Sequence, residues 1–115
     1  MADKENIMVF CKITAIIRPE KLEAVEDVLK QKKVRGMTVS KVKGFGEYAN
    51  FYTSDWLCTH VRVEVFAEAE RGEEYAAAIM QAAYTGVEGD GIVAVSPVQS
   101  VYHVRLQKKC DRQPC

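Results

Sequence analysis

The stretch from Thr85 to Gly91 has the residue types of an anion-binding turn. It is Thr-Gly-Val-Glu-Gly-Asp-Gly, with three glycines in seven residues, between a helical pattern and the apolar run Ile92–Val95. Glycine adopts positive φ and has no side chain to block a phosphate, so such a turn can present successive backbone N–H groups to an anion. The alternative is an ordinary helix-to-strand connection with Gly86 as the helix C-cap. Taken alone, the turn fits this second interpretation better.

Length and charge limit the possible functions. The chain has 115 residues, enough for one domain with a modest core, of which 48% are hydrophobic and 28% charged. Its 16 acidic residues balance its 16 basic ones, so no global field would recruit nucleic acid or anionic lipid. No apolar run approaches the roughly 20 residues of a membrane helix. Because the polar residues 1–6 are unlike a secretory signal, we expect a single cytoplasmic domain over residues 1–115.

The four cysteines are unlike the disulfide framework of a small secreted protein. Cys11 and Cys58 are isolated, which is typical of small packing residues. Cys110 and Cys115 lie five residues apart in a polar tail, and so short a loop can close into a disulfide if the two Cα atoms come within reach. Two thiols alone make a poor zinc site, so we expect no metal. A reversible redox pair and an inert tail are equally compatible with this spacing.

Hydrophobic periodicity places the glycine turn in a chain of alternating strands and helices. Period-two alternation predicts strands, and apolar residues three and four apart predict helices. The predicted strands are Ile7–Ile17, Met37–Lys43, His60–Phe66, Ile92–Ser96 (ended by Pro97) and Val101–Leu106; the predicted helices are Pro19–Lys33 and Glu70–Tyr84. Strand-helix-strand thus occurs twice. This order predicts an α+β fold, a ferredoxin-like βαββαβ sandwich whose half-apolar second sheet face favours oligomerisation.

Residues 44–59 lack a sustained period but are unusually aromatic. Tyr48, Phe51, Tyr52 and Trp56 stand there among small polar residues. This composition predicts a long loop used for contact with other molecules. The alternative is that the aromatic side chains pack beneath the loop or within a subunit interface.

Several motifs together resemble the PII family of signal-transduction proteins. The likeness runs from about Ile13 to Arg105, and the segments that carry it are Ala15–Leu22, Gly36–Val39, Val42–Gly46, Thr85-Gly86 and Gly89–Gly91. The resemblance implies a homotrimer of ferredoxin-like subunits that binds adenine nucleotides in the clefts between neighbours. It also implies a target-contacting T-loop at residues 44–59, a B-loop-like phosphate turn at 85–91 and a C-terminal tail at 107–115.

The sequence departs from the family pattern where phosphate charge would be compensated. Ile92 stands in place of a lysine, and Val87 in place of another basic residue. Of two C-terminal arginines, the first is His103 and only Arg105 remains. Losing two charged contacts costs about 10- to 1000-fold in affinity for the extra phosphates of ATP. We therefore expect AMP and ADP to rival or exceed ATP as ligands.

Further departures concern the second ligand. Tyr48 replaces a glutamine that helps to hold metal and 2-oxoglutarate in the family, and His60 replaces the lysine that pairs with 2-oxoglutarate. The pattern around the modified tyrosine is absent, so Tyr52 should not inherit that role. The Cys110 and Cys115 pair resembles that of carbon-regulatory PII-like proteins, which associate with bicarbonate transport or carboxysomes. By this resemblance the chain is identified with that group.

The resemblance also assigns site residues. The expected nucleotide-binding set is Gly36, Met37, Thr38, Gly44, Gly46, Phe66, Gly89, Asp90, Gly91, His103 and Arg105. The expected bicarbonate set is Arg18, Lys43, Gly44 and Gly46. Four of these residues also fit a role without a ligand: Thr38 as an ordinary strand residue, Phe66 as a core aromatic, His103 as a strand-face histidine, and Arg18 as a helix-start residue.

The expected function is a non-enzymatic ADP or AMP sensor. It would regulate inorganic carbon metabolism or transport through its T-loop, with a bicarbonate transporter or carboxysome-related protein as partner. A second possibility is slow hydrolysis of a nucleotide, but no nucleophile–base pair can be identified near the turn, and Glu88 or Asp90 would have to act alone. A nitrogen-type regulator that responds to ATP and ADP is a third, and a metal-binding trimer of similar fold is a fourth.

Overall fold

The computed structural model describes residues 9–44 and 59–111. Four strands form the main sheet, and they are β1 (Phe10–Ile17), β2 (Thr38–Lys43), β3 (Thr59–Glu68) and β4 (Gly91–Val98). The two helices are α1 (Leu22–Gln31) and α2 (Gly72–Ala83), which follow short 3-10 turns, η2 (Pro19–Lys21) and η3 (Ala69–Arg71). Predictions that concern residues 1–8, 45–58 and 112–115 lie outside the described residues.

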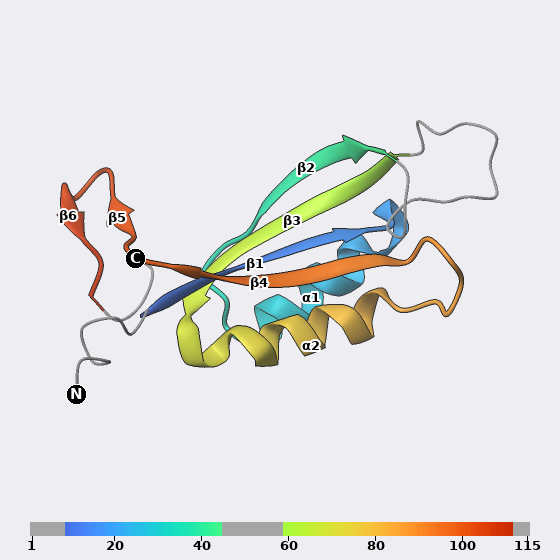
Figure 1. Ribbon diagram of the computed structural model, residues 1–115, viewed down its shortest axis with the longest axis horizontal. Helices are drawn as coiled ribbons and strands as arrows, with labels where there is room; N and C mark the ends of the chain where they lie inside the picture. The colour runs from blue at the N-terminus through green and yellow to red at the C-terminus, as the bar shows by residue number, and fades with distance from the viewer. Residues whose placement is uncertain (1–8, 45–58, 112–115) are drawn as a thin grey trace.

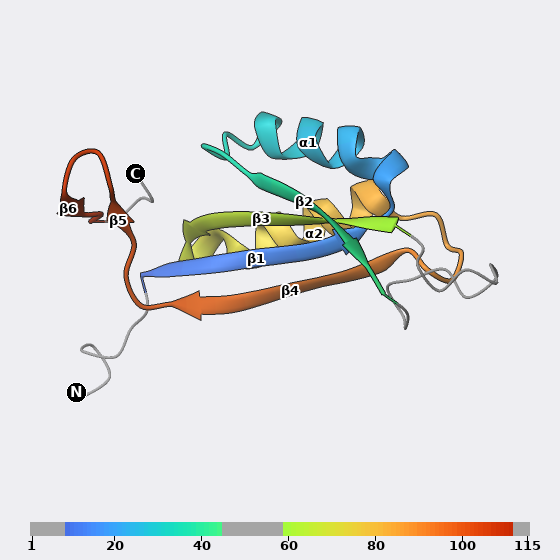
Figure 2. The ribbon, with the colours of Figure 1, turned by 90° about the horizontal axis from the view of Figure 1, so that it is seen from above.

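The main sheet is antiparallel and has the strand order β2-β3-β1-β4. At one end of β1, Ile17 pairs with Val61 of β3 on one side and with Gly91 of β4 on the other. Both helices lie against the same face of this sheet (Figures 1 and 2). The strand order and the helix placement confirm the predicted ferredoxin-like α+β sandwich.

The core lies between that sheet face and the two helices. Every second residue of β1 points into it, and Ile13, Ala15 and Ile17 are at most 1% exposed. α1 contributes Val25 and Leu29, whose spacing of four residues puts them on one face of the helix. The other core residues of the helix layer are Tyr75, Ile79 and Ala83 of α2. The period-two and period-four patterns of the sequence therefore meet in one core.

The predicted stop at Pro97 is wrong, because β4 continues through Pro97 to Val98. Pro97 pairs with Cys11 of β1, and no other strand among the described residues lies on the other side of β4. Proline lacks an N–H donor but is tolerated on an edge strand whose N–H would face away from the ladder. The strand can therefore accommodate the proline that the sequence pattern suggested as a terminator.

The predicted strand Val101–Leu106 is also wrong. The chain instead forms β5 (Tyr102–His103) and β6 (Lys108–Lys109), which pair with each other in a separate two-stranded sheet. The Gln107 amide donates to the carbonyl of Val104 at 3.3 Å, and Gln107 has φ 53°, so the chain turns back here. The hairpin stands beyond the end of the main sheet (Figure 1).

No helix within residues 9–44 and 59–111 combines the length and apolar character that a bilayer crossing requires.

Candidate functional site

The carboxylate of Asp90 organises the turn between α2 and β4. Its Oδ2 accepts hydrogen bonds from the amides of Thr85 and Gly86, both at 2.8 Å. Its Oδ1 accepts from the Thr85 hydroxyl, and the Val87 amide in turn donates to the Thr85 Oγ1 at 3.1 Å. The hydrogen bonds to the Asp90 side chain therefore hold Thr85 and Gly86, at the start of the turn, next to Asp90 near its end.

The carbonyl groups of the turn are held from the sheet side. Arg18 donates through Nη2 to the carbonyl oxygens of Glu88 at 2.8 Å and Val87 at 3.4 Å, and through Nε to Asp90 Oδ1 at 3.0 Å. The Nε2 atom of His60 lies 3.0 Å from the carbonyl oxygen of Gly89. Because a carbonyl can only accept, the imidazole carries its hydrogen on Nε2. The carbonyl groups of Val87, Glu88 and Gly89 thus each accept a hydrogen bond from a side chain outside the turn.

The strand register explains why these side chains meet. β1 ends at Ile17, opposite Val61 and Gly91, so one step further places Arg18 between His60 and Asp90. His60 is only 4% exposed, and its buried Nδ1 atom has no hydrogen-bond partner in the part of the chain that the structure describes. The site is therefore built at one end of the three strands β3, β1 and β4.

Gly91 fixes the exit of the turn into β4. Its φ is +117°, a region that favours glycine, and a Cβ atom there would lie 1.8 Å from the carbonyl oxygen of Ile16. Gly89, with φ +99°, supplies the other sharp change of direction. The backbone conformation therefore requires glycine at position 91 for a steric reason that does not depend on a ligand.

Two backbone amides of the turn have no hydrogen-bond partner within the described residues. The amides of Thr85, Gly86 and Val87 are occupied within the turn, whereas those of Gly89 and Asp90 donate to no group in the described part of the chain. Successive amides in a glycine-containing turn form a concavity that suits a phosphate oxygen. An anion-binding role of this turn stays a prediction, and the side chain of Asp90 supports the turn from within.

Burial of Asp90 works to raise the pKa of its carboxyl, but hydrogen bonds from Thr85, Arg18 and Gly86 hold that pKa well below its usual value of 3.8. A depressed pKa contributes stability above 3.8, which is lost as the pH falls through the folded-state value. We expect Asp90→Asn to lower the free energy of unfolding by about 1 to 3 kcal/mol at pH 7 and to flatten its acid dependence. Urea unfolding at a series of pH values from 6 to 2 measures both. Equal acid losses in the two proteins would contradict this role.

A second group of predicted residues lies at the opposite edge of the sheet. Gly36, Met37 and Thr38 enter β2, where Thr38 pairs with Glu64, and the turn adjoins β4 at the other edge. Phe66 of β3 lies near this group and is 48% exposed, so it is not a core aromatic. Since β3 and β1 separate the two edges, this group and the turn do not form one site within a single chain.

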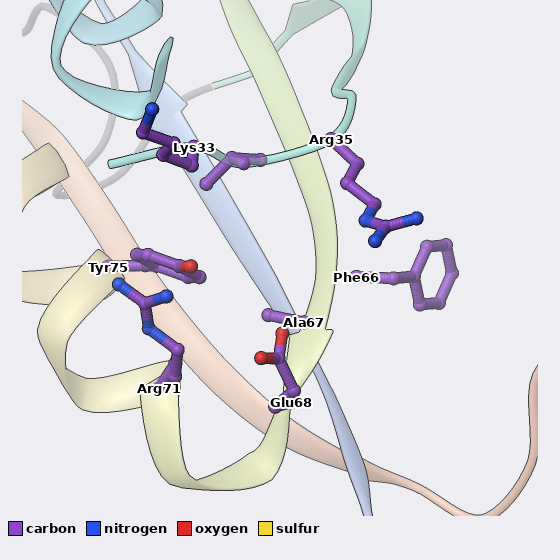
Figure 3. Close-up of a pocket in the computed structure, with 8 residues that line it drawn as sticks. Lys33, Arg35, Phe66, Ala67, Glu68, Arg71 and Tyr75 are labelled. Carbon is purple, nitrogen blue, oxygen red and sulfur yellow. The ribbon is translucent and has the colours of Figure 1, made fainter. Parts of the chain in front are cut away.

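Phe66 borders a cavity of about 210 Å³ (Figure 3). Its cationic groups come from the chain between α1 and β2 (Lys33, Arg35) and from η3 (Arg71), and its aromatic groups are Phe66 of β3 and Tyr75 of α2. The guanidinium of Arg71 stacks 4.9 Å from the ring centre of Tyr75, while Phe66 points away from both. The lining residues are Lys33, Val34, Arg35, Phe66, Ala67, Glu68, Arg71 and Tyr75.

His103 and Arg105 form a third group, at the far end of the molecule. They belong to the β5–β6 hairpin, which Figures 1 and 2 place at the opposite end of the long axis from the α2–β4 turn. The Nδ1 atom of His103 accepts a hydrogen bond from the Leu106 amide at 3.1 Å, and Arg105 is exposed. Any joint action of these residues with the turn requires a second subunit.

The remaining predicted residues are scattered or outside the described part. Lys43 ends β2 and Gly44 follows it, with β3 between them and Arg18. Gly46 and Cys115 lie outside the described residues. Cys110 is disulfide-bonded, but its partner is not among the described residues, so the pairing with Cys115 stays a prediction. Within residues 9–44 and 59–111, no three His, Cys, Asp or Glu side chains gather as metal ligands.

The sequence did not reveal two residues that stabilise the turn, Thr85 within it and His60 of β3. Thr85 contributes its amide and hydroxyl to Asp90, and His60 contributes its imidazole to Gly89. Threonine five residues before aspartate in a glycine-rich stretch is a local signal for this contact, since threonine and aspartate side chains bond nearby backbone groups in turns. The contact of His60 spans 29 residues and has no local signal.

Comparison with known proteins agrees with this fold. The family described as nitrogen regulatory protein P-II matches residues 10–108. Nitrogen regulatory protein P-II of Azospirillum brasilense is 39% identical, over 85% of this chain and 94% of its own length. P-II 1 of Methanothermobacter thermautotrophicus is 42% identical, over 82% of this chain and 88% of its own.

A solved structure is similar over nearly the whole chain. The crystal structure of Arabidopsis thaliana PII bound to citrate has a TM-score of 0.79 and 32% sequence identity, and covers 96% of this chain and 97% of its own. The family thus matches most of the chain, and two of its members are 39% and 42% identical to it. This chain belongs to the nitrogen regulatory protein P-II family of signal-transduction proteins.

Proposed function

We propose that the protein is a cytoplasmic, non-enzymatic sensor of ADP or AMP that acts as a homotrimer. The nucleotide occupies clefts between subunits, and residues 44–59 pass its state to a target protein. The target belongs to inorganic carbon metabolism, as a bicarbonate transporter or a carboxysome-related protein. Membership of a signal-transduction family supports the regulatory part of this proposal.

The observation that carries the proposal is the turn centred on Asp90. It is held from the sheet side by Arg18 and His60, and the amides of Gly89 and Asp90 would bind one phosphate. Val87 and Ile92, which are 55% and 42% exposed, stand beside it where cations would compensate further phosphates. A site that relies on amide dipoles more than on cations favours a short adenylate over ATP.

The separation of the predicted residues supports the trimer. The turn, the group Gly36–Thr38 with Phe66, and the hairpin residues His103 and Arg105 lie at different edges and ends of one chain. In a closed ring of subunits, one edge of each molecule meets a different edge of the next. This arrangement brings the adenine-reading and phosphate-holding groups together in a cleft.

Calorimetric titration with AMP, ADP and ATP tests the nucleotide preference. We expect AMP and ADP to bind at least as tightly as ATP. In the variant Val87→Lys/Ile92→Lys, two added cations should raise ATP affinity about 10- to 1000-fold relative to AMP. The uncharged control Val87→Met/Ile92→Met should leave the ratio unchanged. A strong ATP preference of the original protein would refute the proposal.

A nitrogen-type regulator that responds to ATP and ADP is the second candidate, because the similar proteins are named as nitrogen regulators. The two functions differ in their second ligand. Bicarbonate should tighten ADP binding, and ADP should tighten bicarbonate binding by the same factor, since linkage is reciprocal. Coupling of ATP to 2-oxoglutarate instead would favour the nitrogen-type function. Analysis of the nucleotide after long incubation excludes or reveals hydrolysis.

A further inference from the structure

We propose that the ion pair between Arg18 and Asp90 determines how many phosphates the turn prefers, by cancelling the charge of the guanidinium that supports it. This inference rests on the proposed nucleotide site and identifies its specificity-determining residues. It assigns Arg18 a role in charge selection at the turn, whereas the sequence suggested a bicarbonate contact for it.

The geometry shows that the two side chains act as a unit. Arg18 Nε lies 3.0 Å from Asp90 Oδ1, and the Arg18 and Asp90 side chains are 14% and 24% exposed. Arg18 Nη2 binds the carbonyl oxygens of Val87 and Glu88. The guanidinium therefore lies against the turn, with Nε directed at the carboxylate and Nη2 at two carbonyls.

The charge of this unit is close to zero. Hydrogen bonds hold the pKa of Asp90 well below its usual value despite the opposing effect of burial, so its carboxylate is ionised at neutral pH and offsets the charge of Arg18. The turn then attracts a phosphate through amide dipoles alone. Each further phosphate of a nucleotide adds negative charge that no cation of this unit compensates.

Neutralising one partner changes that balance in a defined direction. In Asp90→Asn the side-chain oxygen can still accept from the Thr85 and Gly86 amides, while Arg18 stays anchored to the carbonyls of Val87 and Glu88 with its charge uncompensated. In Arg18→Gln the carboxylate of Asp90 keeps its bonds to Thr85 and Gly86, but its own charge is uncompensated. The double variant again has no net charge at this place.

The test is a double-mutant cycle read out as the ratio of ATP affinity to AMP affinity by calorimetry. We expect Asp90→Asn to raise the ratio about tenfold, Arg18→Gln to lower it about tenfold, and the double variant to return to within about threefold of the original. Circular dichroism and thermal unfolding establish that each variant is folded. Because the two single variants move the ratio in opposite directions, either one alone tests the sign if the other does not fold.

The outcomes separate this inference from the proposed function. An unchanged ratio in a folded single variant that still binds AMP overturns the role of the ion pair and leaves the nucleotide sensor standing. A fall of AMP and ATP affinity by the same factor in both single variants also overturns it, because it shows a purely structural role. Failure of the original protein to bind any of the three nucleotides contradicts the proposed function, and this inference falls with it.

Discussion

Gly91→Ala is expected to lower the free energy of unfolding by about 3 to 5 kcal/mol and to abolish nucleotide binding. The added Cβ would lie 1.8 Å from the carbonyl oxygen of Ile16, a backbone atom that cannot rotate away. The residue would also have to keep φ +117°, which adds strain of about 1 to 3 kcal/mol for an L-amino acid. Since Gly91 pairs with Ile17 at the end of β1, the shift would reach Arg18 and the turn.

Gly36→Ala is the matched control. A Cβ at Gly36 would meet no atom within 4 Å, so the free energy of unfolding should change by less than about 0.5 kcal/mol. Urea unfolding of the three proteins at the same subunit concentration measures the effect, because the stability of an oligomer depends on concentration. Equal stabilities of Gly91→Ala and the original protein would contradict a close approach of Gly91 to the carbonyl of Ile16.

The fold could be predicted where local pattern and tertiary environment agree. The alternation of β1 and the spacing of Val25 and Leu29 in α1 directly specify buried faces, and both elements form as expected. Prediction failed where the outcome depends on neighbours. Pro97 lies in a strand because β4 is an edge among the described strands. The alternating run Val101–Leu106 does not join the main sheet; its residues Tyr102–His103 form β5 and the rest turn back toward β6.

The turn at residues 85–91 could be predicted from the sequence, but the side-chain contacts that hold it could not. Its glycines are close in sequence, and their conformational role follows from composition. The contact of Arg18 with Asp90 spans 72 residues, and that of His60 with Gly89 spans 29, so both depend on the order of β3, β1 and β4. For this reason sequence patterns suggested an anion contact for Arg18 and missed the support that it gives the turn. A bicarbonate role for Arg18 stays a prediction.

The second large expected effect is complementation between subunits. The turn and the group Gly36–Thr38 with Phe66 lie at opposite edges of one chain, so each proposed nucleotide site combines the turn of one subunit with this group of its neighbour. Gly89→Asp places a carboxylate in the phosphate turn. Because Gly89 has φ +99°, circular dichroism is used to establish that this variant is folded. Thr38→Trp blocks the opposite edge, where Thr38 is exposed on β2. We expect each variant alone to form trimers that bind no AMP, because every cleft then contains one damaged half.

The most direct test of a nucleotide site shared between two subunits uses both variants in one trimer. The two variants are co-expressed with different tags, mixed trimers are isolated, and AMP is titrated into them. A cleft is intact when its turn comes from a Thr38→Trp chain and its edge from a Gly89→Asp chain. In a mixed trimer, one of the three junctions between neighbours has this order, so binding should return in about one third of the clefts. Folded mixed trimers that bind no AMP would contradict a site shared between subunits.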